Sequence, residues 1–143
     1  MGSNPAVATI FMKIYTIEEA RELVHKIKPV IRDIKSKAYD YSKYHMETSR
    51  LVFNFRNSPY DKDGILDKII NTRKELKKLI DEVGSHSVLL RDIESGTIDI
   101  PSQMNGEEIF FCWKIFEEQD VMWWHGVNEH CSKRKPLKQK ENL

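Results

Sequence analysis

The sequence predicts an α+β fold, in which a long antiparallel helical hairpin is followed by a small antiparallel β-meander of three or four strands. Two long segments before Gly84 carry apolar residues at helical spacing. After Gly84 the apolar residues alternate, and turn signals such as Asn105-Gly106 recur at short intervals. A chain of 143 residues can bury a core of its own without a disulfide or a metal.

The first helix is expected to begin at a capping box formed by Thr16 and Glu19, which satisfy each other's free N–H groups. Apolar residues then recur every three or four positions between residues 20 and 55. Pro29 removes one helical hydrogen bond, which predicts a kink or a short break. Asn57-Ser58-Pro59 is expected to end the helix, because the residue before a proline avoids the helical region.

The second helix is expected to begin at Asp61 or Asp63, to bury a stripe between Ile65 and Val83, and to end at Gly84. At 1.5 Å per residue it reaches about 30 Å, whereas the first helix reaches about 60 Å. Roughly half of the first helix therefore lacks a helical partner within the chain. Either the C-terminal segment or a second copy must cover it, and we expect a homodimer through the long first helix.

The chain therefore divides into an N-terminal extension (residues 1–15) with room for one short strand, a hairpin (16–84), a sheet packed on the hairpin (85–130) and a basic C-terminal tail (131–143). Four strand segments are predicted, at residues 88–93, 97–100, 108–115 and 121–126. Pro101 is a candidate bulge.

Turn lengths predict the register of the sheet. A two-residue turn at Asn105-Gly106 places Asp99 opposite Cys112. A four-residue loop over residues 117–120 places Cys112 opposite His125, so the three residues form one Asp/Cys/His row across neighbouring strands. The other face is then an apolar core face, with Trp113 opposite Trp124; its members are Ile98, Ile100, Ile109, Phe111, Trp113, Ile115, Met122 and Trp124.

The Asp/Cys/His row predicts a metal site. Asp99, Cys112 and His125 offer a carboxylate, a thiolate and an imidazole, which suit zinc or iron and leave a position for water, as in a metal-dependent hydrolase. The candidates for a fourth ligand are Glu117, Glu118, His130 and Cys131.

Two other interpretations of the row stay open. Cys112 and His125 can form a nucleophile pair, although the charge of Asp99 opposes a thiolate. Alternatively, the row only packs, and the protein is a non-enzymatic homodimeric interaction module. The sequence assigns no catalytic residue and no small-molecule substrate.

Composition limits the expected partners and location. With 23 Lys+Arg and 22 Asp+Glu the net charge is +1, which argues against a general binder of nucleic acid or of membrane surfaces. The basic run 133–140 is typical of a solvated terminus. Two distant cysteines do not make a disulfide framework, so we expect a reduced, cytoplasmic protein.

Between Met12 and Leu137 the chain resembles the prokaryotic domain family of unknown function catalogued as number 2203. The segments that carry the resemblance are Thr16-Ile17-Glu18-Glu19-Ala20, Arg91-Asp92-Ile93, Gly96, Ile98-Asp99-Ile100-Pro101, Gly106, Phe111-Cys112-Trp113-Lys114, Glu117, Trp124-His125, Arg134 and Pro136-Leu137. The Cys-Trp and Trp-His segments are the most specific of these. The resemblance implies a small cytoplasmic bacterial or archaeal protein and brings no activity with it.

This chain departs from the family pattern after Trp124-His125. The pattern usually continues with an acidic residue, a later aspartate and glycines, whereas this chain has Gly126, Asn128, His130 and Lys133. The departure removes possible acidic ligands and offers His130 as a substitute.

Overall fold

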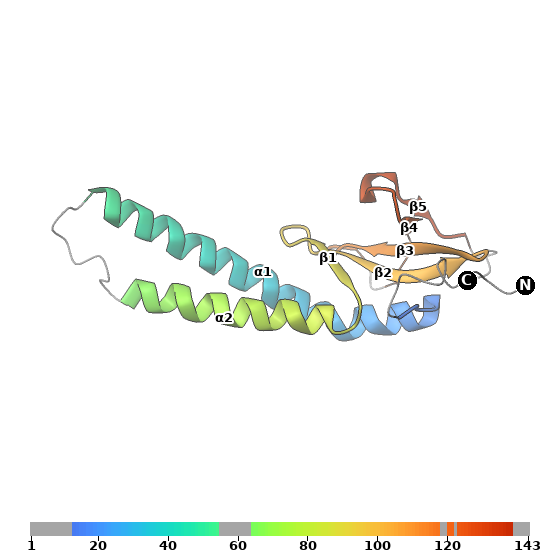
Figure 1. The fold of residues 1–143 in the computed structure, drawn as a ribbon, viewed down its shortest axis with the longest axis horizontal. Coiled ribbons are helices and arrows are strands. Elements are labelled where there is room, and N and C mark those ends of the chain that lie inside the picture. Colours follow the sequence, from blue (N-terminus) through green and yellow to red (C-terminus); the bar gives the residue numbers. More distant parts are fainter. Residues whose placement is uncertain (1–12, 55–63, 118–119, 122, 139–143) are drawn as a thin grey trace, which may run out of the picture.

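A computed structural model describes residues 13–54, 64–117, 120–121 and 123–138. It confirms the α+β class, with two helices followed by an antiparallel sheet (Figure 1). Within the described residues the sheet has five strands, in the order β1-β2-β3-β4-β5, and the fifth lies in the segment predicted as a basic tail. The elements are α1 (Ile17–Asn54), α2 (Ile65–Gly84), β1 (Leu89–Asp92), β2 (Thr97–Met104), β3 (Glu107–Trp113), β4 (Trp123–Gly126), the 3₁₀ turn η3 (Cys131–Lys133) and β5 (Lys135–Pro136).

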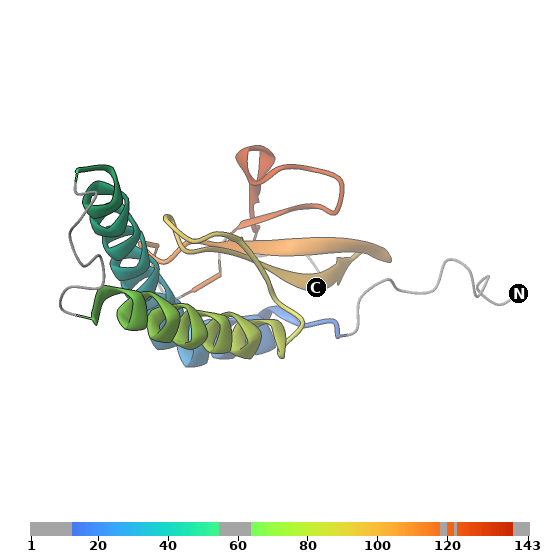
Figure 2. The same cartoon turned by 60° about the vertical axis from the view of Figure 1, so that its left-hand side comes forward.

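The helical hairpin begins at the predicted capping box. Glu19 Oε1 accepts from the Thr16 N–H at 2.9 Å, and Thr16 Oγ1 accepts from the Glu19 N–H at 3.1 Å. Helix α1 is continuous through Pro29, so the short break does not occur there, and Figure 2 shows α1 bending between its blue and teal parts. The predicted stop at 57–59 and both predicted caps of the second helix lie outside the described residues. Neither described helix has an apolar stretch that could cross a membrane.

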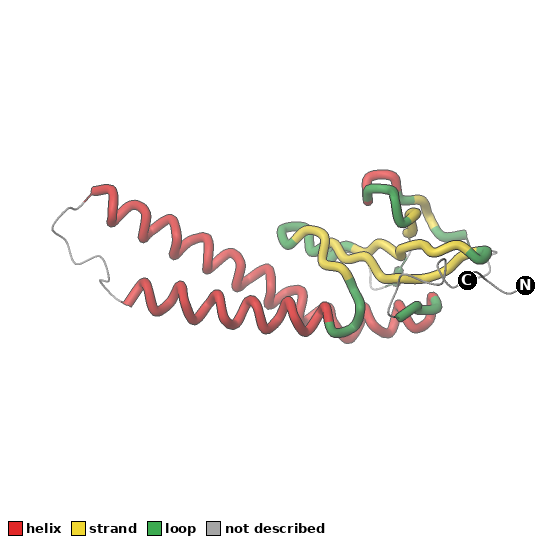
Figure 3. The backbone as a smooth tube through the Cα atoms, viewed as in Figure 1, coloured by secondary structure: helices red, strands yellow, loops and turns green. Residues whose placement is uncertain are grey.

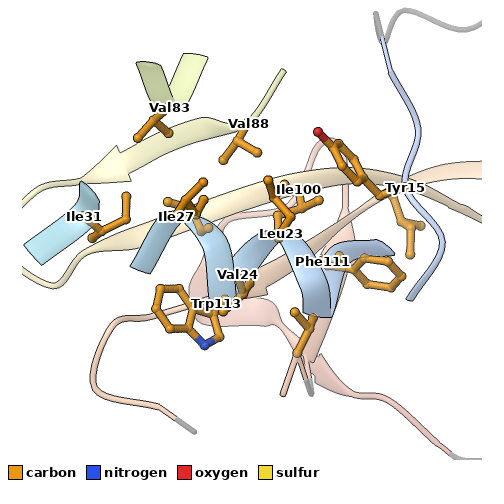
Figure 4. Close-up of a cluster of buried hydrophobic side chains, with 14 of the residues drawn as sticks. Tyr15, Leu23, Val24, Ile27, Ile31, Val83, Val88, Ile100, Phe111 and Trp113 are labelled. Carbon is orange, nitrogen blue, oxygen red and sulfur yellow. The ribbon is translucent and has the colours of Figure 1, made fainter. Parts of the chain in front are cut away.

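The sheet packs on the N-terminal half of α1. The stripe predicted from heptad spacing is buried there, with Ala20, Val24, Ile27, Ile31 and Ile34 at most 1 % exposed. Figure 4 shows side chains of α1 meeting side chains of β2 and β3, among them Leu23, Val24, Ile27, Ile31, Ile100, Phe111 and Trp113. The sheet thus covers this half of α1, while the outer part of the hairpin extends beyond the strands (Figure 3).

The register between β2 and β3 is as predicted. Asn105 and Gly106 have positive φ angles of 53° and 81°, as a two-residue hairpin turn requires, and Asp99 pairs with Cys112. Strand β2 continues to Met104, and its pairing with β3 passes through Pro101 without a shift, so the bulge considered there does not form.

The predicted register between β3 and β4 is wrong by two residues. Cys112 pairs with Trp123 instead of His125, and Trp124 pairs with Phe111 instead of Trp113. Strand β3 ends early because a turn follows it at once, in which the Glu117 N–H donates to the Lys114 carbonyl at 2.9 Å. An even shift keeps the described residues of β3 and β4 on their predicted faces, so Cys112 and His125 are diagonal neighbours on the same face.

Gly96 generates a prediction about stability. Its φ is +62°, and a Cβ there would lie 2.8 Å from Ile115 Cγ2 and 3.0 Å from Ile31 Cγ2. We expect Gly96→Ala to lower the free energy of unfolding by about 3 kcal/mol, through backbone strain plus overpacking. Gly106→Ala is the matched control, because φ is +81° but nothing lies within 4 Å, so it should cost only about 1 kcal/mol. Urea denaturation measures both, and equal losses would contradict the close approach.

Candidate metal-binding site

The site lies on the outer face of the sheet, which we define as the face turned away from α1. Strand alternation places Asp99, Cys112 and His125 there because their neighbours in sequence face the core. All three are buried, with 1, 0 and 1 % of their surface exposed. These side chains are covered by the C-terminal segment, which is the part of the chain after β4. It is drawn in red in Figures 1 and 2 and lies on the side of the sheet opposite the helices.

The three side chains converge. One carboxylate oxygen of Asp99, Sγ of Cys112 and one ring nitrogen of His125 all lie within 4.8 Å of one another. The His125 Nδ1 is 2.8 Å from the Gly126 carbonyl oxygen. A carbonyl only accepts, so Nδ1 is the donor and carries a proton. The other nitrogen, Nε2, faces Asp99 Oδ1 at 3.0 Å and points into the cluster.

Arg91 fixes the second oxygen of the carboxylate. Its Nε donates to Asp99 Oδ2 at 2.8 Å, and its guanidinium lies 5.2 Å from the centre of the Phe110 ring. Arg91 stands at an irregularity of β1, because Leu90 pairs with Ile98 but Asp92 pairs with Thr97. The sequence does not indicate that Arg91 belongs to the site, because a bulge of this kind has no clear signal in one sequence.

Without a bound metal, Cys112 is a protonated thiol. Burial, together with the negative charge of Asp99, raises the pKa of the Cys112 thiol to about 12. The Arg134 guanidinium lowers this pKa, since its Nη1 lies 3.9 Å from Sγ, but burial outweighs it. A buried thiol with so high a pKa is a poor nucleophile, which argues against the Cys-His pair.

Glu117, one of the predicted ligands, binds Arg134 instead. Arg134 Nη1 and Nη2 donate to the two carboxylate oxygens at 3.0 and 2.5 Å, in a bidentate pair whose side chains are 16 % exposed. The Lys114 N–H donates to the same carboxylate at 2.8 Å. Arg134 also stacks on Trp123, 4.6 Å from its ring centre. Arg134 therefore holds the C-terminal segment on the outer face. The sequence did not indicate this role, because Arg134 lies in a basic run that is typical of a solvated terminus.

His130, the other predicted ligand, also lies outside the cluster. It is exposed and caps η3, with Nδ1 accepting from the Ser132 N–H at 3.1 Å. Cys131, weighed as a fourth ligand, is half-buried beside a pocket of about 380 Å³. That pocket opens at the edge of the site and is lined by Arg91, Asp99 and residues 127–131.

The different environments of the two cysteines predict different reactivity. Without metal at pH 8, a thiol with a pKa of about 12 is ionised to about one part in ten thousand, so Cys112 should resist iodoacetamide. The partly exposed Cys131 should be alkylated readily. Peptide mass spectrometry distinguishes the two sites, and unfolding in guanidinium should make both react. Fast alkylation of Cys112 in the folded protein would contradict the assignment.

Comparison with known proteins gives a family and no activity. The model of the uncharacterised conserved protein family DUF2203 matches residues 13–137, which include both helices, all five strands and the three clustered side chains. No curated protein and no solved structure matches the chain. The match spans most of the 143 residues and agrees with the resemblance found from the sequence. The chain belongs to the DUF2203 family.

Proposed function

We propose that this protein binds a divalent metal ion, zinc or iron, through Asp99, Cys112 and His125. One observation carries the proposal: three different metal-binding groups, from three neighbouring strands, place their ligand atoms within 4.8 Å of one another. All three groups are buried, where a carboxylate, a thiol and an imidazole are costly to place without partners. Exposed acidic clusters are common on protein surfaces, whereas a buried mixed group such as this one is not.

The distances suit a small ion. Two ligand atoms that bind one tetrahedral zinc at 2.0–2.1 Å lie roughly 3.3 Å apart. Asp99 Oδ1 and His125 Nε2 are 3.0 Å apart, so a metal can replace the proton between them with little movement. In a tetrahedral zinc site a sulfur ligand lies roughly 3.6 Å from the oxygen and nitrogen ligands. The three ligand atoms here are up to 4.8 Å apart, so metal binding would bring Cys112 Sγ closer to the other two.

The groups behind the ligands also support metal binding. The Gly126 carbonyl holds the proton of His125 on Nδ1, which leaves Nε2 as the ligand atom, the usual arrangement behind a metal-bound histidine. Arg91 orients the carboxylate of Asp99, and Arg134 lies beside the sulfur of Cys112. A divalent ion would balance one thiolate and one carboxylate, because metal binding removes the thiol proton.

The chemistry of the ligands favours zinc or iron over magnesium and calcium. A thiolate and an imidazole suit zinc or iron, whereas magnesium and calcium prefer oxygen ligands throughout. A hydrolytic function would require the fourth position of the metal to hold water. The pocket at Asp99 is the route by which that water would enter.

Metal analysis tests the proposal. After incubation with zinc and desalting, the wild type should hold about one zinc per chain, and Cys112→Ser and His125→Gln should hold about a tenth or less. His25→Gln and His130→Gln are matched controls, since both histidines are exposed and outside the cluster, and should keep the metal. Zinc should also raise the melting temperature of the wild type but not of the two site variants. A wild type that retains no zinc, or site variants that retain it fully, would overturn the proposal.

Exposed apolar side chains on the outer hairpin favour a second function, homodimerisation through α1. Tyr39 and Met46 are 70 and 72 % exposed and line a groove of about 440 Å³ together with Ser42, Lys43 and Glu47. Two copies packed antiparallel about a twofold axis would cover both apolar side chains.

Light scattering across a range of protein concentrations tests the dimer. The wild type should be dimeric, and Tyr39→Glu combined with Met46→Glu should be monomeric, because two buried, unpaired carboxylates oppose association. Ile70→Glu on α2 is the matched control, since Ile70 is 50 % exposed on the other helix, and it should remain dimeric. A monomeric wild type would refute dimerisation, and loss of the dimer only in Ile70→Glu would place the interface on α2.

A further inference from the structure

We propose that Cys131 is the fourth ligand of this metal, so that the ion is held by Asp99, Cys112, His125 and Cys131 in a closed tetrahedral site. The inference rests on the proposed function and decides what kind of metal site it is. A metal with three protein ligands keeps a position for water, whereas four protein ligands are typical of structural zinc.

Both cysteines of the chain lie on the outer side of the sheet. The sequence contains two cysteines, 19 positions apart, and the fold brings them to this side from β3 and from η3. Cys131 and Asp99 line the same pocket. The Lys114 Nζ lies 4.0 Å from Cys131 Sγ and 3.0 Å from Thr97 Oγ1, and Thr97 precedes Asp99 by two positions on the same face of β2. The side chain of Cys131 therefore lies at the pocket through which the row is reached.

Coordination by Cys131 requires a local movement of its segment, because its thiol is not among the three groups that lie within 4.8 Å of one another. The segment between β4 and β5 is held at both ends, by pairing of Trp123 with Pro136 and of Trp124 with Lys135. Between those ends the residues are exposed or half-buried, and Cys131 begins the three-residue turn η3. Its Sγ has long contacts of 3.8 Å to His130 Nδ1 and 4.0 Å to Lys114 Nζ. Coordination therefore displaces no short hydrogen bond of this thiol.

The surrounding charges suit two thiolates. Two thiolates, one carboxylate and a divalent ion carry a net charge of −1. Lys114 lies beside Cys131, Arg134 beside Cys112 and Arg91 beside Asp99, so each anionic ligand has a cation of its own. Arg134 is itself shared with Glu117, which leaves the site near neutrality.

A closed site makes the metal a clamp. It would join β2, β3 and β4 to the C-terminal segment. The Arg134–Glu117 pair already links this segment to the turn after β3. Water would have no free coordination position, so the metal would stabilise the fold instead of activating a nucleophile.

Protection of the thiols tests the inference. Zinc added to the wild type should slow alkylation of Cys131 by about tenfold or more, because a coordinated thiolate is a weaker nucleophile. Ser132→Ala is the matched control in the same turn and should show the same protection. If zinc binds in the stoichiometry given above but Cys131 reacts as fast as without metal, this inference is overturned while the proposed function stands. If no zinc binds, both fail.

Cobalt counts the sulfur ligands directly. The thiolate-to-cobalt charge-transfer absorption of the wild type should fall by about half in Cys131→Ser, with cobalt still bound more weakly. Cys131 is half-buried in a short turn, so this variant should fold, as circular dichroism can verify. Equal absorption per bound cobalt in the wild type and in Cys131→Ser would mean that one thiolate binds the metal, which contradicts the inference.

Discussion

The packing of the apolar stripe of α1 against the inner face of the sheet is the constraint on which the rest of the structure depends. Val24, Ile27 and Ile31 lie against Phe111 and Trp113, and all five are at most 1 % exposed. Because side chains alternate along a strand, this contact forces the residues between the core positions to the opposite face. Asp99, Cys112 and His125 are on the outer face for that reason, whatever their own chemistry.

The outer face would be accessible to water if the sheet were the last layer of the protein. The C-terminal segment prevents this, and Arg134 anchors it by combining a bidentate pair with Glu117 and a stacking contact with Trp123. Because the cover excludes water, a charged group in the cluster is energetically costly. A buried carboxylate requires a partner, and a buried thiol stays protonated. When no metal is bound, Arg91 is a partner of the Asp99 carboxylate. The same burial would make a bound metal hard to remove.

The two proposed functions depend on different parts of the protein. The proposed metal site belongs to the sheet and its cover, whereas the exposed Tyr39 and Met46 belong to α1, whose outer part extends beyond the strands (Figure 1). Coverage of the N-terminal half of α1 by the sheet removes the original reason to expect a second copy there. Among the described side chains of α1, the exposed large apolar ones are Tyr39 and Met46, both in its outer part.

The sequence by itself determined the two helices, the capping box, the two-residue turn and the faces of the described residues of β2, β3 and β4, because these follow from local periodicity and turn chemistry. It also identified Asp99, Cys112 and His125, although the β3–β4 register was wrong by two residues, since an even shift leaves the faces unchanged. The tertiary structure alone decided which cations contact these groups, that Glu117 binds Arg134, and that Cys131 lines the pocket at Asp99. Those contacts join residues whose positions depend on loop length, on a bulge in β1 and on a two-residue edge strand. None of these features has a period that a single sequence can reveal.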